Sequence, residues 1–235
     1  MGVKLAICAG PATTGKSAVL RHVVAKLQAL GRRPAYLKID VQYAEEDEQF
    51  AREFGIPTRK VYSGELCPDH CNVMVLGDAL EWAGKSGADV LLVETAGLCL
   101  RCSPYVGGGL GLVVLEATSG MNLPRKVGPM LSLADVAVVT KIDRVSQAER
   151  EVFRARIQDA APGVKVREVN ALYGIGIEPI MRLVEATPEA VGQLYLRGNP
   201  PVGTCTICVG KKEVGWQSHF GVVRPLENQT FYRGE

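Results

Sequence analysis

The stretch GPATTGKS, residues 10–17, decides the fold of this chain. It satisfies the pattern G-x-x-x-x-G-K-[ST], follows the apolar run VKLAICA (3–9) and opens the helical pattern of residues 15–31. In this pattern the glycines let backbone N–H groups turn inward on phosphates, the lysine neutralises the β and γ oxygens, and the hydroxyl holds Mg²⁺. The sequence therefore predicts a nucleotide phosphate site, with Gly10, Thr13, Thr14, Gly15, Lys16 and Ser17 as its binding residues.

Apolar runs alternate with helical patterns along most of the chain. Runs rich in Val, Leu and Ile, too continuous for half-exposed strands, predict strands at 3–9, 35–40, 89–95, 110–118, 134–140 and 164–169. Helical patterns lie between them at 15–31, 45–55, 72–87, 146–160 and 176–187. This alternation predicts right-handed β-α-β units and an α/β fold with a doubly wound, mainly parallel sheet. The pattern ends near residue 188, so we expect a P-loop domain over 1–187 and a small cysteine-containing C-terminal extension over 188–235.

The composition excludes several classes of protein. With 235 residues and 47% hydrophobic content, the chain can bury a core as one large domain with an appendage. The 27 Lys and Arg residues nearly balance the 25 Asp and Glu residues, so nothing demands nucleic acid or an anionic membrane as a partner. No apolar run reaches the roughly 18 residues that a membrane span needs. The start, MGVKLAICAG, lacks the long apolar core of a secretory signal, and we expect a cytoplasmic protein.

Two downstream segments indicate which base is bound. TKID (140–143) resembles the [N/T]-K-x-D element of GTP-binding proteins, in which the aspartate accepts hydrogen bonds from guanine N1 and N2. VNALYGIGI (169–177) resembles the S-A-x-x-G-x-G loop that completes a guanine pocket, with asparagine in place of serine. Adenine offers no such pair of donors, so GTP is favoured over ATP. The predicted base-binding residues are Lys141, Asp143, Asn170, Ala171 and Leu172.

Two strand ends supply acidic residues beside the phosphate loop. VETAG (93–97) places Glu94 where a P-loop protein usually has an aspartate, and KIDVQ (38–42) places Asp40 at the end of the second strand. With these motifs, the chain from residue 3 to about 185 resembles the metallocentre-assembly GTPases of the HypB/UreG/CobW type, within the SIMIBI class of P-loop NTPases.

The resemblance implies a Mg²⁺-dependent GTPase that acts as a slow switch. In that family the residues matching Asp40 and Glu94 arrange Mg²⁺ and the attacking water, so Lys16, Asp40 and Glu94 are expected to be catalytic, and Ser17, Asp40 and Glu94 to hold Mg²⁺. Family members commonly form homodimers across their nucleotide faces, with GTP favouring closure. The simpler alternative is that Asp40 caps a turn and Glu94 pairs with Lys16.

Six of the seven cysteines fall in pairs, which in a cytoplasmic protein indicates ligands or reactive thiols rather than disulfides. The segment ELCPDHC (65–71), with a proline keeping the turn tight, sets Cys67, His70 and Cys71 within five positions. Cys67 matches the cysteine of the nickel-insertion members, although the urease-type pattern Cys-Pro-His is altered here by one inserted residue and a second thiol. Two thiolates and an imidazole suit zinc, iron, copper(I) or nickel. The alternative is that both cysteines are buried as small apolar residues.

Two C-x-x-C pairs follow. Cys99 and Cys102 come directly after VETAG, where a bound group would sense the nucleotide state, and Cys205 and Cys208 lie in the extension. Two such pairs are the usual sequence form of a four-thiolate zinc or iron-sulfur site. The sequence leaves open whether the pairs meet within one chain, across a dimer or not at all.

These features together favour a dimerising GTPase that couples its nucleotide state to a cysteine-held metal or iron-sulfur cluster and thereby matures a client metalloenzyme. One alternative is a nucleotide-driven iron-sulfur electron donor. Another is a metal-binding adaptor whose nucleotide site regulates association with little turnover. A small-molecule kinase is the weakest contender, since a kinase gains nothing from TKID or from thiols beside its switch loop.

Overall fold

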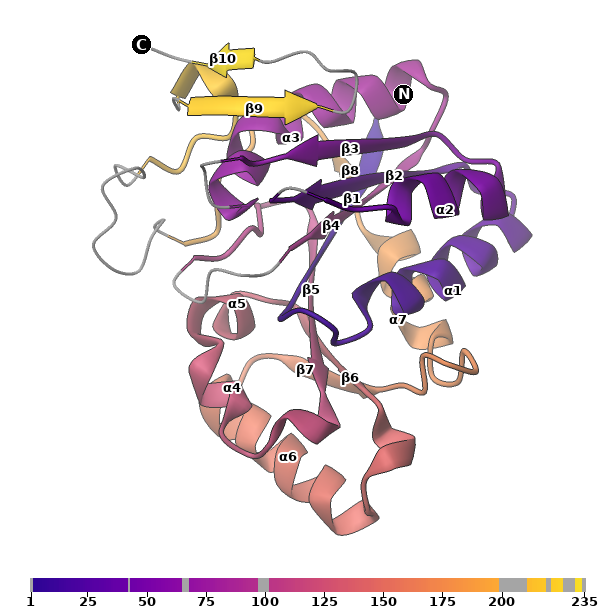
Figure 1. The fold of residues 1–235 in the computed structure, drawn as a ribbon, viewed down its shortest axis with the longest axis vertical. Helices are drawn as coiled ribbons and strands as arrows, with labels where there is room; N and C mark the ends of the chain where they lie inside the picture. Colours follow the sequence, from indigo (N-terminus) through magenta and orange to yellow (C-terminus); the bar gives the residue numbers. More distant parts are fainter. Residues whose placement is uncertain are drawn as a thin grey trace.

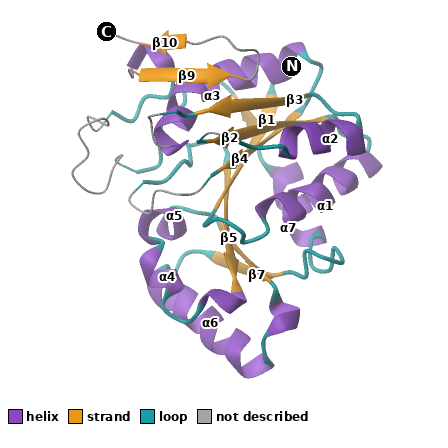
Figure 2. Cartoon of the chain, in the orientation of Figure 1, coloured by secondary structure: helices purple, strands orange, loops and turns teal. Residues whose placement is uncertain are grey.

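The structure of the protein, a computed structural model, describes residues 2–41, 43–64, 68–96, 102–198, 211–218, 221–225 and 231–233. Over these residues the strands form one sheet in the order β10-β9-β3-β2-β4-β1-β5-β6-β7, with β8 also paired to β1 (Figure 1, Figure 2). The strands are β1 (Val3–Ala9), β2 (Pro34–Asp40), β3 (Thr58–Tyr62), β4 (Val90–Thr95), β5 (Leu110–Glu116), β6 (Val136–Thr140), β7 (Lys165–Glu168), β8 (Glu189–Ala190), β9 (Gly221–Pro225) and β10 (Phe231–Arg233). The helices are α1 (Lys16–Ala29), α2 (Glu46–Phe54), α3 (Pro68–Lys85), α4 (Leu123–Lys126), α5 (Gly128–Ser132), α6 (Gln147–Ala160) and α7 (Glu178–Ala186), with 3₁₀ turns η1 (Ala117–Ser119), η2 (Ile142–Arg144) and η3 (Trp216–Ser218).

Helices cover both faces of the sheet (Figure 1). On β4, Val90 and Leu92 pack in a buried apolar layer with α1 and α7, whereas Leu91 and Val93 pack in the opposite layer with α3. Because side chains alternate along a strand, burial of both faces requires the continuous apolar runs seen in the sequence. The predicted α/β fold with a doubly wound, mainly parallel sheet is confirmed, since every pairing from β3 through β7 is parallel.

The strand order places a reversal point at β1. The chain leaves β1 toward β2 on one side of the sheet, and after β4 it crosses to β5 on the other side. Ligands of such sheets bind at the carboxyl ends of the strands where the order reverses. The loop after β1 and the ends of β2 and β4 meet at this place.

The structure differs from the sequence prediction at β3 and at α3. The strand β3, TRKVY, was not predicted because it is short and carries Arg59 and Lys60, so it lacks the apolar run used to recognise the other strands. The helix predicted over 72–87 begins at Pro68, not at residue 72. Proline suits the first helical turn, where its missing N–H has no helical partner. His70 and Cys71 therefore belong to a helix and not to a tight turn.

The described parts of the extension pack on the main sheet. β8 pairs antiparallel with β1, and β9 pairs antiparallel with β3. Leu194 and Leu196 form backbone hydrogen bonds with Val214 and Lys212, and Gly215 N donates to the Val73 carbonyl of α3 at 2.9 Å. The division into units 1–187 and 188–235 remains a prediction.

In the described part of the chain no helix has the length and apolar character to cross a membrane.

Candidate functional site

The phosphate loop joins β1 to α1 in a conformation that its sequence requires. Gly10 has φ +145°, and a Cβ there would lie 2.3 Å from the Val114 carbonyl oxygen, so only glycine fits. Thr13 and Gly15 also have positive φ, at 63° and 91°. The Thr140 hydroxyl donates to the Thr14 carbonyl at 2.6 Å and ties the loop to the end of β6. The loop thus places the start of α1, with its free N–H groups, at the mouth of the reversal point.

Lys16 lies buried inside this loop. Its ammonium donates to the carbonyls of Gly10 and Pro11, each at 3.0 Å. Burial lowers the pKa of Lys16, and the negative charge of Glu94 only partly offsets this. These acceptors are neutral carbonyls and do not neutralise the Lys16 ammonium. Its positive charge can therefore pair with an anion that enters the loop.

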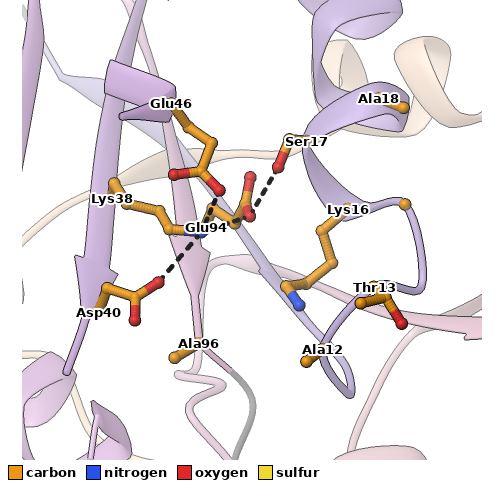
Figure 3. A pocket seen from close by; sticks show the side chains of 11 residues that line it. Ala12, Thr13, Lys16, Ser17, Ala18, Lys38, Asp40, Glu46, Glu94 and Ala96 are labelled. Atoms are coloured by element: carbon orange, nitrogen blue, oxygen red, sulfur yellow. Dashed lines mark hydrogen bonds and ion pairs between the residues drawn. The ribbon is translucent and has the colours of Figure 1, made fainter. Parts of the chain in front are cut away.

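Glu94 is the most tightly held group of the site (Figure 3). It is 1% exposed, and it lies on the same face of β4 as Leu92, toward α1. Its Oε1 accepts from the Ser17 hydroxyl at 3.0 Å and from Lys38 Nζ at 2.7 Å. Its Oε2 accepts from the Tyr36 hydroxyl at 2.9 Å. Burial, and then the charge of Glu94, raise the pKa of Tyr36, so the phenol remains protonated and remains a donor. The simpler alternative, in which Glu94 pairs with Lys16, is therefore wrong about the partner, because the lysine that Glu94 pairs with is Lys38.

Two further carboxylates surround the ammonium of Lys38. Asp40 Oδ2 lies 3.4 Å from Lys38 Nζ, and Glu46 Oε1 lies 3.2 Å from it. Asp40 also accepts from the backbone N–H of Val41 at 2.8 Å, the local contact expected of a turn cap. Burial by itself would lower the pKa of Lys38, but the carboxylates, Glu94 foremost, raise it well above the usual value.

These groups line one pocket of about 410 Å³ (Figure 3). Its wall contains the predicted magnesium residues Ser17, Asp40 and Glu94, together with Lys16 and Lys38. A hydroxyl and two carboxylates are the hard oxygen donors that Mg²⁺ prefers, so the donor set fits this ion. The structure thus brings together side chains from β2, β4 and α1 that are far apart in sequence.

The predicted base residues lie on loops at the other end of the site. Lys141 has φ +55° and forms an ion pair with Glu116 at the end of β5. Asp143 lies exposed in η2. A non-glycine residue with positive φ is uncommon and marks a locally constrained turn, here the one between β6 and η2.

The second base segment is a compact loop. The side chain of Asn170 accepts from the backbone N–H groups of Leu172 and Tyr173, at 3.1 and 3.3 Å, so asparagine holds the turn that the related pattern gives to serine. The Ala171 carbonyl accepts from His22 Nε2 of α1 at 2.9 Å. The sequence does not indicate this role of His22, because a single histidine in a helical pattern points to no particular function.

Three of the seven cysteines lie in the described residues, and all three are buried. His70 and Cys71 lie in the first turn of α3, at 2% and 0% exposure. Cys102 is buried in the segment before β5, and the Asn72 amide donates to the nearby Pro104 carbonyl at 3.0 Å. The other predicted ligands, Cys67, Cys99, Cys205 and Cys208, lie outside the described residues. Over the residues that are described, no group of three or more His, Cys, Asp or Glu side chains is placed to hold a metal ion.

Tyr36, Lys38 and Glu46 are site residues that sequence reasoning missed. Tyr36 and Glu46 lie in no motif, and Lys38 opens KIDVQ without a role assigned to it, yet Tyr36, Lys38 and Asp40 alternate along β2 and so face the same side of the sheet. This alternation was visible in the sequence. The pairing of Lys38 with Glu94 across β2 and β4 was not visible, because it depends on strand order.

The sequence comparison decides the family. Residues 4–168 match the model of the CobW/HypB/UreG nucleotide-binding domain. The chain belongs to this family. The CobW/HypB/UreG match confirms the predicted membership among SIMIBI-class metallocentre-assembly GTPases and supports a nucleoside triphosphatase activity.

Individual relatives agree with the CobW/HypB/UreG assignment. An uncharacterised protein of Methanocaldococcus jannaschii is 42% identical over 99% of this chain and 100% of its own length. Urease accessory protein UreG 2 of Streptomyces griseus is 33% identical over 75% of this chain and 84% of its own length.

Solved structures confirm the fold. HypB of Helicobacter pylori, crystallised in complex with nickel, superposes with a TM-score of 0.64 at 17% identity, over 81% of this chain and 92% of that one. The hydrogenase maturation factor HypB of Archaeoglobus fulgidus gives a TM-score of 0.62 at 20% identity, over 78% and 89%.

Proposed function

We propose that this CobW/HypB/UreG protein is a Mg²⁺-dependent GTPase that couples its nucleotide state to a cysteine-held metal and delivers that metal to a client metalloenzyme. One observation carries the proposal: a buried glutamate, Glu94, is fixed 3.0 Å from the Ser17 hydroxyl of a complete phosphate loop. A buried carboxylate beside the helix that holds phosphate is the arrangement expected of a nucleotide hydrolase and not of a passive binding site.

The hydrolysis follows from the positions of the side chains. The loop N–H groups and Lys16 bind the β- and γ-phosphates, and Ser17 with Asp40 and Glu94 would hold Mg²⁺, which when bound neutralises charge on the leaving phosphates. Glu94, with one oxygen fixed by Tyr36, is positioned to accept a hydrogen bond from the attacking water. Phosphoryl transfer needs no covalent intermediate. It needs positioning and charge neutralisation, and these groups supply both.

We assign GTP in preference to ATP. Asp143 lies exposed at the end of β6, where its carboxylate can accept from guanine N1 and N2, and adenine presents no such pair of donors. The loop of Asn170, Ala171 and Leu172 is braced against α1 by His22, which supports a preformed base pocket.

We propose nickel as the cargo, bound as substrate and not as a resident cofactor. The UreG name of one relative and the nickel in the HypB crystal support this choice. Candidate ligands are Cys67, His70, Cys71, Cys99, Cys102, Cys205 and Cys208. The Asn72–Pro104 hydrogen bond supports a shared site, because it joins the helix turn after Cys71 to the segment after Cys102. Zinc and an iron-sulfur cluster are the competing occupants, and a cytoplasmic homodimer is the expected form.

Phosphate release tests the enzymatic part. With Mg²⁺, the wild type is expected to hydrolyse GTP faster than ATP, and Lys16→Ala is expected to lose about 10³-fold in kcat/KM because the β and γ oxygens lose their cation. Lys85→Ala, which removes an exposed lysine of α3, is the matched control and should match the wild type. Unimpaired GTP turnover in Lys16→Ala would overturn the assignment.

Metal analysis after anaerobic purification tests the cargo. Nickel that is lost in both Cys67→Ala and Cys99→Ala/Cys102→Ala would support the shared nickel site, whereas nickel retained in Cys99→Ala/Cys102→Ala and lost in Cys67→Ala would confine the site to ELCPDHC. Iron with acid-labile sulfide, lost in the Cys99→Ala/Cys102→Ala variant, would contradict the nickel proposal and favour an iron-sulfur protein.

A further inference from the structure

Lys38 is a buried lysine of the pocket that no part of the motif pattern explains. Its side chain is 4% exposed, and its ammonium lies among the carboxylates of Glu94, Glu46 and Asp40 at 2.7, 3.2 and 3.4 Å (Figure 3). Burying an ammonium is unfavourable unless it is paired, and these carboxylates provide the pairing. A lysine that served only to fill the strand would not face the phosphate pocket, which Lys38 lines together with Lys16.

The position of Lys38 conflicts with Mg²⁺. Glu94 Oε1 is the atom that Lys38 contacts and also the atom that accepts from Ser17. An Mg²⁺ ion bonds oxygen at about 2.1 Å, so an ion on this oxygen would lie within about 5 Å of the Lys38 ammonium in its present place. Two cations at that distance in a buried pocket repel each other strongly. An Mg²⁺ ion held by this oxygen would therefore compete with the ammonium for Glu94.

The displaced ammonium has a destination within the same pocket. Lysine is a compact charge on a flexible four-carbon stem, so its head can move while the strand stays in place. The described wall of the pocket contains two ammonium groups, those of Lys16 and Lys38. It also contains three carboxylates, those of Asp40, Glu46 and Glu94. Lys16 lies across the pocket from Lys38, inside the phosphate loop, so a terminal phosphate bound between them would meet a different lysine on each side (Figure 3).

We propose that Lys38 is a second phosphate-binding cation of this site, which Mg²⁺ displaces from Glu94 and Asp40 and which then pairs with the terminal phosphate of GTP. This rests on the proposed nucleotide site and goes beyond it. It makes Lys38 the residue that senses whether the terminal phosphate is present, since GDP with the same Mg²⁺ offers the ammonium no such partner.

The chain provides a matched control in Lys60. Lys60 is the register partner of Lys38 on the neighbouring strand β3 and is as deeply buried, at 3%. It pairs with Asp47 at 2.9 Å and donates to the Ala44 carbonyl at 2.6 Å, and the described lining of the pocket does not include it. Lys60→Met therefore removes a buried ammonium of the same sheet face without touching the phosphate site.

The test compares GTP and GDP affinities with fluorescent nucleotide analogues in the presence of Mg²⁺. In Lys38→Met the affinity for GTP is expected to fall about 10- to 100-fold, as for a lost charge-assisted hydrogen bond, with GDP affinity within about threefold of wild type. Lys60→Met should keep the wild-type ratio of GTP to GDP affinity. Lys38→Gln keeps a donor toward Glu94 and serves as a second neutral variant if Lys38→Met does not fold.

A second readout uses MgCl₂ alone. In calorimetric titration without nucleotide, the Lys38 variants should bind Mg²⁺ more tightly than the wild type and Lys60→Met, because the ammonium no longer competes for Glu94 and Asp40. If the ratio of GTP affinity to GDP affinity is unchanged in the folded Lys38 variants, whether both affinities stay the same or both fall equally, the inference is overturned. If the wild type and Lys60→Met bind neither nucleotide, the proposed function itself fails.

Discussion

At the phosphate end of the site, strands fix the charged groups: Glu94 is 1% exposed and is held by three donors from two elements, Ser17 of α1 and Tyr36 and Lys38 of β2. At the base end, loops carry them: Asp143 lies exposed in a single 3₁₀ turn, and Leu172 of the neighbouring loop is 73% exposed. A buried carboxylate that several donors hold on a strand stays in place unless another cation replaces one of those donors, whereas exposed loop residues adjust freely. Rate and base preference should therefore be separable by mutation.

The largest expected effect is at the phosphate end. Glu94→Gln keeps the size of the side chain but removes its charge, so Lys38 loses its closest carboxylate and the attacking water loses its charged acceptor. We expect kcat for GTP to fall about 10²- to 10³-fold, as when one preorganised electrostatic group is removed. Steady-state phosphate release at saturating GTP measures this. Wild-type kcat in this variant would remove Glu94 from the mechanism.

An intermediate effect is expected at the base end. Asp143→Asn replaces one of the two carboxylate oxygens that accept from guanine N1 and N2 with an NH₂ donor, so GTP affinity should fall about 10- to 100-fold while kcat at saturation changes little. Inosine triphosphate, which lacks the 2-amino group, provides the control. The wild type should bind GTP more tightly than the inosine nucleotide, and the variant should lose that preference. An unaltered preference would show that Asp143 does not read the base.

The smallest effect concerns the brace between α1 and the base loop. His22→Ala removes the hydrogen bond to the Ala171 carbonyl, which is worth about 1 kcal/mol, so GTP affinity should fall by about fivefold or less. Gln28→Ala on the same helix removes a side-chain bond to the Phe54 carbonyl, away from the base loop, and should leave nucleotide affinity unchanged. Equal effects of the two variants would mean that His22 acts only through the stability of α1.

Much of the phosphate site could be predicted because each part carries a local signal. The loop of Gly10 to Ser17 has a fixed pattern, and Glu94 ends a continuous apolar run, so the sequence singled out both, and the structure brings them together in one pocket. The partner of Glu94 could not be predicted. Lys38 and Glu94 are 56 residues apart, and their contact exists only because β2 and β4 are neighbours in the sheet.

In the cysteine segment ELCPDHC, the local structure could not be predicted from the sequence. The proline of ELCPDHC indicated a tight turn, but Pro68 begins α3, and the helix buries His70 and Cys71 in its first turn. A proline fits a turn and a first helical residue equally well, so the local sequence does not separate the two. Whether these side chains bind a metal remains a prediction, since four of the seven proposed ligands lie outside the described residues.

The most direct test of the division between rate and recognition is single-turnover hydrolysis of GTP at saturating protein, with Glu94→Gln and Asp143→Asn measured side by side. The structure predicts a rate at least about 100-fold below wild type for Glu94→Gln and a rate within about threefold of wild type for Asp143→Asn. A slow Asp143→Asn under saturation, or a wild-type rate for Glu94→Gln, would contradict a site in which buried strand charges perform the chemistry and surface loops select the base.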